Sequence, residues 1–222
     1  MPAEDRIRIQ RATPTIDTEP MEEALDPTRE PSESDVAANE RLTSLTGALL
    51  LVLLALMGVT VLSVQDLLPE HFLLGFLLIP PLTLKLASTG YRFVRYYTGD
   101  PRYRHAGVPQ PVLRLIAPIV VISTIVVFAT GIELWWFGLR YGSIWIEAHR
   151  LSFIVWLPAT AIHVLSHMNR SGRAVVEELS ATPVAGASRR RAVVIGALVA
   201  GIVLAAASLT YASPFIFFGD GG

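Results

Sequence analysis

Five long apolar stretches alternate with polar segments along this chain of 222 residues. They cover roughly residues 43–65, 71–91, 112–137, 147–168 and 191–212. A helix needs about 20 apolar residues to cross the hydrocarbon core of a bilayer, and each stretch approaches or exceeds that length. The pattern therefore predicts an all-α membrane protein with five transmembrane helices.

Polar residues recur at matching offsets inside two of these stretches. The second stretch contains His71, Lys85 and Thr89, the fourth contains His149, His163 and His167, and both triplets step by 14 and then by 4 residues. At about 100° per residue, 18 residues return to the same helix face, and 14 residues climb about 21 Å. Each triplet is thus a narrow polar stripe across most of a bilayer. Ionisable groups at this depth are costly and mark candidate functional sites.

The first forty residues have a different composition from the rest. Eleven of them are acidic, several are proline and few are large and apolar. Because such a segment cannot bury enough apolar surface to fold, we expect a disordered acidic cytoplasmic tail at residues 1–41. The predicted remainder is a four-helix transmembrane bundle at 42–170, a cytoplasmic loop at 171–190, and an accessory transmembrane helix with a short outer tail at 191–222.

Composition narrows the chemistry that the chain can perform. Hydrophobic residues make up 52% of the sequence and the mean hydropathy is +0.49, which is too apolar for an ordinary soluble domain. Cysteine is absent, which excludes disulfides, iron–sulfur clusters and thiolate ligation of haem or zinc by this chain. Membrane lipid is the expected surrounding, and no nucleic-acid partner is expected.

Arginines indicate how the chain is oriented in the membrane. The N-terminal tail, the loop after the second stretch and the loop after the fourth each carry five arginines, whereas the alternate segments carry none, one and none. The positive-inside rule then predicts a plasma-membrane protein with a cytoplasmic N-terminus and an extracytoplasmic C-terminus. The second and fourth helices would run in the same direction. His71 and His149 would share an outer depth, and Lys85 and His163 an inner depth.

Two imidazoles at one depth on neighbouring parallel helices can hold a flat macrocycle between them, one on each axial side of its metal. The pair His71 and His149 is therefore the first candidate for a haem site. Gly75 lies one turn below His71 and would let a porphyrin approach the backbone. Arg150 would either neutralise haem propionates or simply lie at the outer interface.

The stretches HFLLGFLLIPPLTLKLASTGYRFVRYYTGDPRYR and AHRLSFIVWLPATAIHVLSHM resemble a known family. With two histidines 14 residues apart on one helix and a histidine on a parallel helix, residues 45–170 look like the four-helix di-haem cytochrome b membrane subunits. Relatives in that family are the cytochrome b subunits of bacterial formate dehydrogenases and nickel–iron hydrogenases, and small cytochromes paired with molybdenum-cofactor oxidoreductases. The resemblance implies b-type haem, electron transfer and often quinone.

The inner level departs from that family pattern. Where the second helix would carry another histidine it carries Lys85, the only lysine in the chain, so His163 lacks an obvious histidine partner. Three interpretations of Lys85 remain open. It ligates a second haem as a neutral amine opposite His163, it contacts a propionate or a quinone with His163 or His167 as proton partner, or it extends to the inner headgroups.

These patterns predict a membrane electron-transfer subunit that binds one or two b haems through His71, His149 and His163. It would pass electrons between quinone and a separate oxidoreductase, without substrate chemistry of its own. A transporter or proton channel lined by Lys85, His163 and His167 is one alternative. A haem-free anchor of a larger complex, with merely interfacial histidines, is another.

Overall fold

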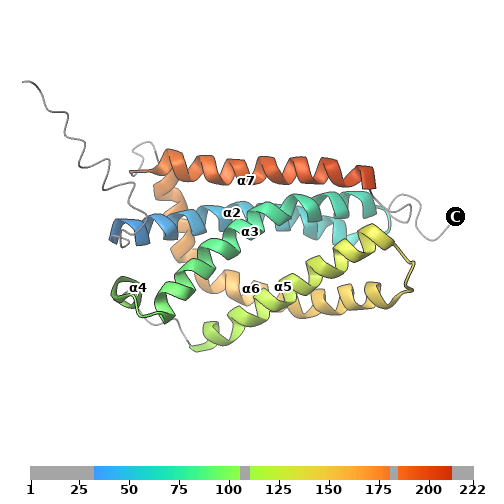
Figure 1. Ribbon diagram of the computed structural model, residues 1–222, viewed down its shortest axis with the longest axis horizontal. Helices are drawn as coiled ribbons and strands as arrows, with labels where there is room; N and C mark the ends of the chain where they lie inside the picture. Colours follow the sequence, from blue (N-terminus) through green and yellow to red (C-terminus); the bar gives the residue numbers. More distant parts are fainter. Residues whose placement is uncertain (1–32, 106–110, 181–184, 212–222) are drawn as a thin grey trace, which may run out of the picture. The chain divides into compact units, whose positions relative to one another are not determined.

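Every secondary-structure element in the described part of the chain is helical. The structure, a computed structural model, describes residues 33–105, 111–180 and 185–211. Its elements are α2 (Glu33–Leu62), α3 (Leu68–Tyr97), α4 (Pro101–His105), α5 (Pro111–Phe137), α6 (Ile144–Leu179), α7 (Ala187–Ser208) and the short 3₁₀ helix η1 (Leu209–Tyr211). The predicted all-α class is thus confirmed (Figure 1).

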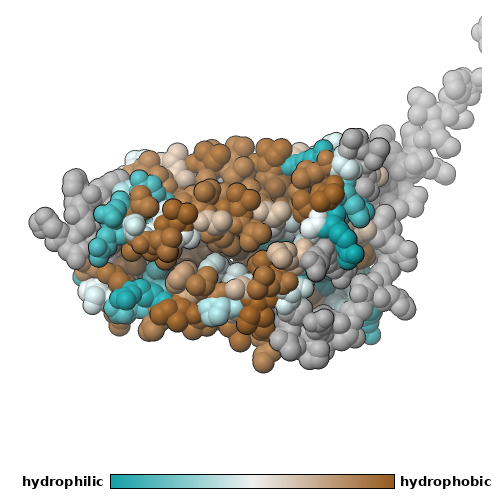
Figure 2. Space-filling view, turned by 180° about the vertical axis from the view of Figure 1, so that it is seen from behind, coloured by the Kyte–Doolittle hydropathy of each residue, from teal (hydrophilic) through white to brown (hydrophobic). Residues whose placement is uncertain are grey.

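Five of these helices are long and apolar enough to cross a membrane. The candidate spans are Val36–Leu62, Leu68–Tyr97, Leu115–Phe137, Ile144–Met168 and Ala187–Tyr211. Their outward side chains are apolar, with Ile122 and Ile154 each 63% and Val203 62% exposed. Figure 2 shows hydrophobic side chains across the middle of the bundle and hydrophilic ones toward both ends. By helix length and hydropathy, the chain is a multi-pass membrane protein.

Two predicted segment boundaries need correction, because helices extend beyond the apolar stretches. Helix α2 begins at Glu33, so residues 33–41 are helical although they were expected to belong to the disordered tail. Helix α6 continues to Leu179, so residues 171–179 are helical although a loop was expected there. Residues 1–32, the greater part of the predicted tail, lie outside the described residues.

Helix α3 lies between α2 and α7, and α6 packs against both α2 and α5. Leu50 and Leu53 of α2 form a buried cluster with Leu78 of α3. On the other side of α3, a Cβ atom at Gly201 of α7 would lie 2.3 Å from the carbonyl oxygen of Leu77. Glycine is therefore required at residue 201 for this close approach of the two backbones.

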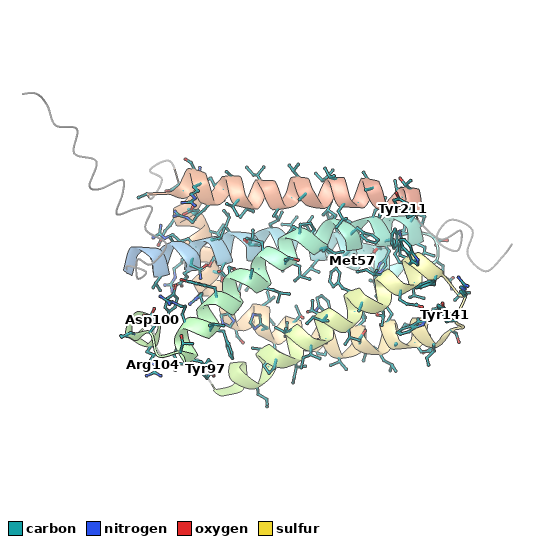
Figure 3. The ribbon with its side chains drawn as sticks, in the orientation of Figure 1. Met57, Tyr97, Asp100, Arg104, Tyr141 and Tyr211 are labelled. Atoms are coloured by element: carbon teal, nitrogen blue, oxygen red, sulfur yellow. The ribbon has the colours of Figure 1, made fainter. Side chains whose placement is uncertain are left out.

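The two ends of the bundle carry different side chains. We call the end at which α3 and α6 begin the histidine end, since His71 and His149 lie there, and the end at which both helices finish the arginine end. Figure 3 shows Tyr141 and Tyr211 at the histidine end, with Tyr97, Asp100 and Arg104 at the opposite end. Helices α3 and α6 run in the same direction (Figure 1), which places the first residues of both at one end.

A tryptophan joins three helices at the histidine end. The ring of Trp135 in α5 lies 4.8 Å from the ring of Phe76 in α3, measured between centroids, and both pack with Ala205 of α7. The indole Nε1 donates a hydrogen bond of 3.1 Å to the carbonyl oxygen of Ser208. The fifth span, predicted as an accessory helix, thus packs on α3 and is tied to the end of α5.

A buried ion pair joins α6 to α7 at the arginine end. Arg190 of α7 donates from Nε to Oε1 of Glu178 and from Nη2 to Oε2, both at 2.8 Å. Glu178 is fully buried, and Arg191 donates to its backbone carbonyl oxygen. Because both carboxylate oxygens are bonded, the last turn of α6 is held firmly against the first turn of α7.

Candidate functional site

The two histidines that were predicted to share one depth meet at the histidine end. His71 lies in the first turn of α3 and His149 in the second turn of α6. Their ring centroids are 6.2 Å apart and their planes are inclined at 84°. The structure therefore brings together the residue pair that the helical spacing and the predicted helix directions singled out.

A threonine from α2 contacts His71. The hydroxyl oxygen of Thr60 lies 3.0 Å from Nδ1 of His71, and Thr60 is only 5% exposed. The short connection between α2 and α3 lets the last turns of α2 lie beside the first turns of α3. The imidazole of His71 is thereby attached to a second helix through one of its two nitrogens.

A threonine from α5 contacts His149 in the same way. The hydroxyl oxygen of Thr130 lies 3.0 Å from Nδ1 of His149. The turn that reverses the chain between α5 and α6 contains Gly138 and Gly142, both at positive φ (56° and 83°), a conformation that glycine adopts at little cost. Room for the ring comes from Gly131, where an added Cβ would lie 3.4 Å from Cε1 of His149.

Two further residues predicted for this site have other neighbours. Gly75 faces α2, where an added Cβ would lie 3.9 Å from the terminal methyl group of Met57. The side chain of Arg150 is 68% exposed and pairs with Glu147 over 3.4 Å. The roles of both residues at a haem site stay predictions.

One acidic side chain near the histidine end has no hydrogen-bond partner among the described residues. Both carboxylate oxygens of Glu133 in α5 are shielded from solvent, and neither accepts a hydrogen bond. An ionised carboxylate without a partner is costly to bury. Among the acidic residues of the described spans, only Glu133 has both carboxylate oxygens buried without a hydrogen-bond partner. Its carboxyl group is therefore expected to be either protonated or paired with a group outside the described residues.

The side chain of Lys85 in α3 reaches across to α2. Its Nζ donates a hydrogen bond of 2.7 Å to the carbonyl oxygen of Thr43, in a space left by Gly47, where an added Cβ would lie 3.0 Å from Nζ. The Thr43 hydroxyl in turn donates to the Asn39 carbonyl oxygen and lies 3.0 Å from the hydroxyl of Ser88. In this conformation Nζ is held between the two helices.

His163 and His167 contact each other on a single helix, α6. The ring centroids of His163 and His167 are 4.7 Å apart, and Nδ1 of His167 donates to the carbonyl oxygen of His163 over 2.9 Å. Nδ1 of His163 is buried and has no hydrogen-bond partner within the described residues. Where side chains are described, no other histidine stands opposite His163, which agrees with the departure noted in the sequence.

Two residues of the site were missed by sequence reasoning, namely Thr60 and Thr130. Each lies near the end of the apolar stretch that precedes a histidine, at the level of that histidine once the chain has reversed. This position in the sequence was the only signal for the two threonines. Their residue type gave none, because hydroxyl groups are common in transmembrane helices. The described residues bring no three of His, Asp and Glu together as a metal cluster.

Comparison with protein-family models, with curated proteins and with solved structures gives no match for this chain. The class of protein defined by the helices is a multi-pass, all-α membrane protein with five candidate spans. The likeness to cytochrome b subunits rests on the histidine-bearing segments alone and stays a prediction.

Proposed function

We propose that the protein binds b-type haem between His71 and His149 and serves as the membrane electron-transfer subunit of an oxidoreductase. The observation that carries the proposal is the separation of the two rings, 6.2 Å between centroids. A haem between these rings would take one imidazole from α3 and one from α6, the arrangement by which helical bundles hold cofactors through side chains on facing helices.

The number of protein ligands also fits a haem iron. A bare metal ion generally needs three or four protein ligands, and no such cluster occurs among the described residues. A porphyrin brings four nitrogens of its own, so two histidines complete its coordination. When bound, haem supplies an iron that accepts and releases one electron, while the chain supplies the axial ligands and an apolar surrounding.

The proposed electron partners follow from the family resemblance. We propose quinone as one partner and a separate oxidoreductase subunit, of molybdenum-cofactor type in one branch of that family, as the other. Lys85, held between α2 and α3, and the paired side chains of His163 and His167 are the polar groups that we propose would contact a quinone or a second haem.

The test is a reduced-minus-oxidised visible spectrum of the purified protein, together with the variants His71→Ala and His149→Ala. We expect a bis-histidine haem signal in the unchanged protein and its loss in both variants, which should still insert into the membrane. His167→Ala is the matched control and should keep the signal of this haem. Absence of haem from the unchanged protein, or retention of the signal in both single variants, would contradict the proposal.

A second candidate function is proton transfer through the inner polar groups without haem. It is favoured by the buried hydrogen bonds that join Lys85, Thr43 and Ser88 between α2 and α3. A protein without haem that carries protons in sealed vesicles, and loses this activity in Lys85→Met, would support it over electron transfer. A haem-free protein without such transport would instead support the anchor alternative.

A further inference from the structure

The hydroxyl groups of Thr60 and Thr130 each face a backbone carbonyl oxygen of their own helix and a histidine ring nitrogen, but each carries only one proton. The Thr60 hydroxyl also lies 3.6 Å from the Met57 sulfur, and the Thr130 hydroxyl 3.0 Å from the Val127 carbonyl oxygen. The Thr60 hydroxyl oxygen lies 2.7 Å from the carbonyl oxygen of Met57, and the Thr130 hydroxyl oxygen lies 2.7 Å from the carbonyl oxygen of Val126. A carbonyl oxygen cannot donate, and an O···O distance near 2.7 Å is typical of a good O–H···O hydrogen bond. The threonine proton must therefore lie between the hydroxyl and its own helix backbone.

The direction of the bond to each imidazole follows from this. With its proton committed to the backbone, each threonine oxygen can only accept, so Nδ1 of His71 and Nδ1 of His149 must be the donors at 3.0 Å. In a neutral imidazole, a proton on Nδ1 leaves the lone pair on Nε2. Both rings are thus fixed in the tautomer that presents Nε2 to a metal.

We propose that Thr60 and Thr130 are positioning residues that hold the axial histidines in the Nδ1–H tautomer and make them stronger ligands. This inference rests on the proposed haem site. Outer hydrogen bonds of this kind orient metal-binding imidazoles and raise their basicity. A more basic axial ligand favours the ferric state, so these bonds would lower the reduction potential of the haem.

The surroundings of the threonines support a specific role over an incidental contact. Thr60 is 5% and Thr130 4% exposed, so water has little access to either threonine–histidine contact. The Val127 carbonyl oxygen, on the same helix as Thr130, is a further acceptor beside His149. For each histidine, the contacting threonine lies on a different helix: Thr60 on α2 contacts His71, and Thr130 on α5 contacts His149. Within the described residues, His163 and His167 lack such a pattern, because His167 donates to the backbone of its own helix and Nδ1 of His163 has no hydrogen-bond partner.

The test uses Thr60→Val and Thr130→Val in the full-length protein, because valine keeps the shape of threonine and removes the hydroxyl. We expect haem affinity to fall by about 10- to 100-fold in each variant and the midpoint potential of the remaining haem to rise. Thr60→Ser and Thr130→Ser keep the acceptor and should restore both values. Thr46→Val is the matched control, since Thr46 is fully buried and its hydroxyl bonds only its own helix at Leu42.

A second measurement separates this inference from the haem proposal. Nitrogen-15 NMR of histidine-labelled apoprotein in detergent should show both rings in the Nδ1–H form. Thr60→Val should move only His71, and Thr130→Val only His149, toward the Nε2–H form. Nε2–H tautomers in the unchanged protein, or unchanged affinity and potential in both valine variants, would overturn the positioning role. Correct tautomers in a protein that takes up no haem would overturn the proposed function instead.

Discussion

Two neighbouring glutamates at the end of α6 form ion pairs that differ in burial, and we expect them to differ in their contribution to stability. Glu177 is 59% exposed and pairs with Arg41 over 3.3 Å, whereas Glu178 is fully buried and is bonded through both oxygens to Arg190. An exposed pair competes with water and contributes little. A buried pair is costly to assemble, but removing one partner leaves the other charge without compensation.

We therefore predict that Glu178→Gln strongly lowers the stability of the protein and that Glu177→Gln does not. The buried guanidinium of Arg190 would lose its counter-charge, at a cost of about 3–5 kcal/mol. The loss at Glu177 should stay within about 1 kcal/mol, because its pair is solvated. Thermal unfolding of the two variants in the same detergent checks the difference, and equal shifts in Tm would show that Arg190 does not depend on this carboxylate.

At the scale of helices, the contact between α3 and α7 depends on the absence of a side chain. A Cβ atom added at Gly201 would lie 2.3 Å from the carbonyl oxygen of Leu77. That distance is shorter than any van der Waals contact. The obstacle is backbone, which cannot rotate away as a side chain would. Five residues earlier in the same helix, at Gly196, an added Cβ would have no atom within 4 Å.

Gly201→Ala should push α7 away from α3, and Gly196→Ala should not. We expect the first change to cost about 1–3 kcal/mol through overpacking, while the gain in helix propensity from alanine, about 1 kcal/mol, is common to both variants. The comparison of Tm values between the two variants therefore isolates the contact. Tryptophan fluorescence should also change only in Gly201→Ala, because Trp135 donates to the end of α7; identical spectra and Tm values would contradict the assigned contact.

At the scale of the whole molecule, the described arginines gather at one end. Those at the arginine end are Arg41, Arg92, Arg95, Arg104, Arg173, Arg189, Arg190 and Arg191, while Arg140 and Arg150 lie at the histidine end. Segments rich in arginine are retained in the cytoplasm during insertion. The arginine end is therefore predicted to face the cytoplasm and the histidine end to face outward.

This orientation predicts the behaviour of reporter fusions. A reporter joined after Gly222 should be active only where the assay requires an extracytoplasmic position, and one joined in the segment between α6 and α7 only where it requires a cytoplasmic position. Reporter activity in whole cells measures both. A cytoplasmic signal at Gly222 would reverse the predicted orientation, and with it the side of the membrane nearest to His71 and His149.

Sequence reasoning was most successful for features that depend only on the length, period and direction of single helices. The five spans and the meeting of His71 with His149 follow from apolar length, from the 3.6-residue period and from helix direction. The Thr60 and Thr130 contacts did not follow, because they depend on which helix faces which across the bundle. The extra helical length from Glu33 and to Leu179 was missed because the contacts there join residues far apart in the sequence, such as Asn39 with Ser88 and Glu178 with Arg190.

The two threonine–histidine pairs have a consequence for how the protein is made. Each histidine takes its acceptor from the helix directly before it in the chain, Thr60 before His71 and Thr130 before His149. In order of synthesis, the hairpin of α2 with α3 therefore supplies one oriented imidazole, and the hairpin of α5 with α6 supplies the other later. The proposed haem site is complete only once α6 has been made, so we expect haem loading to follow the synthesis of α6.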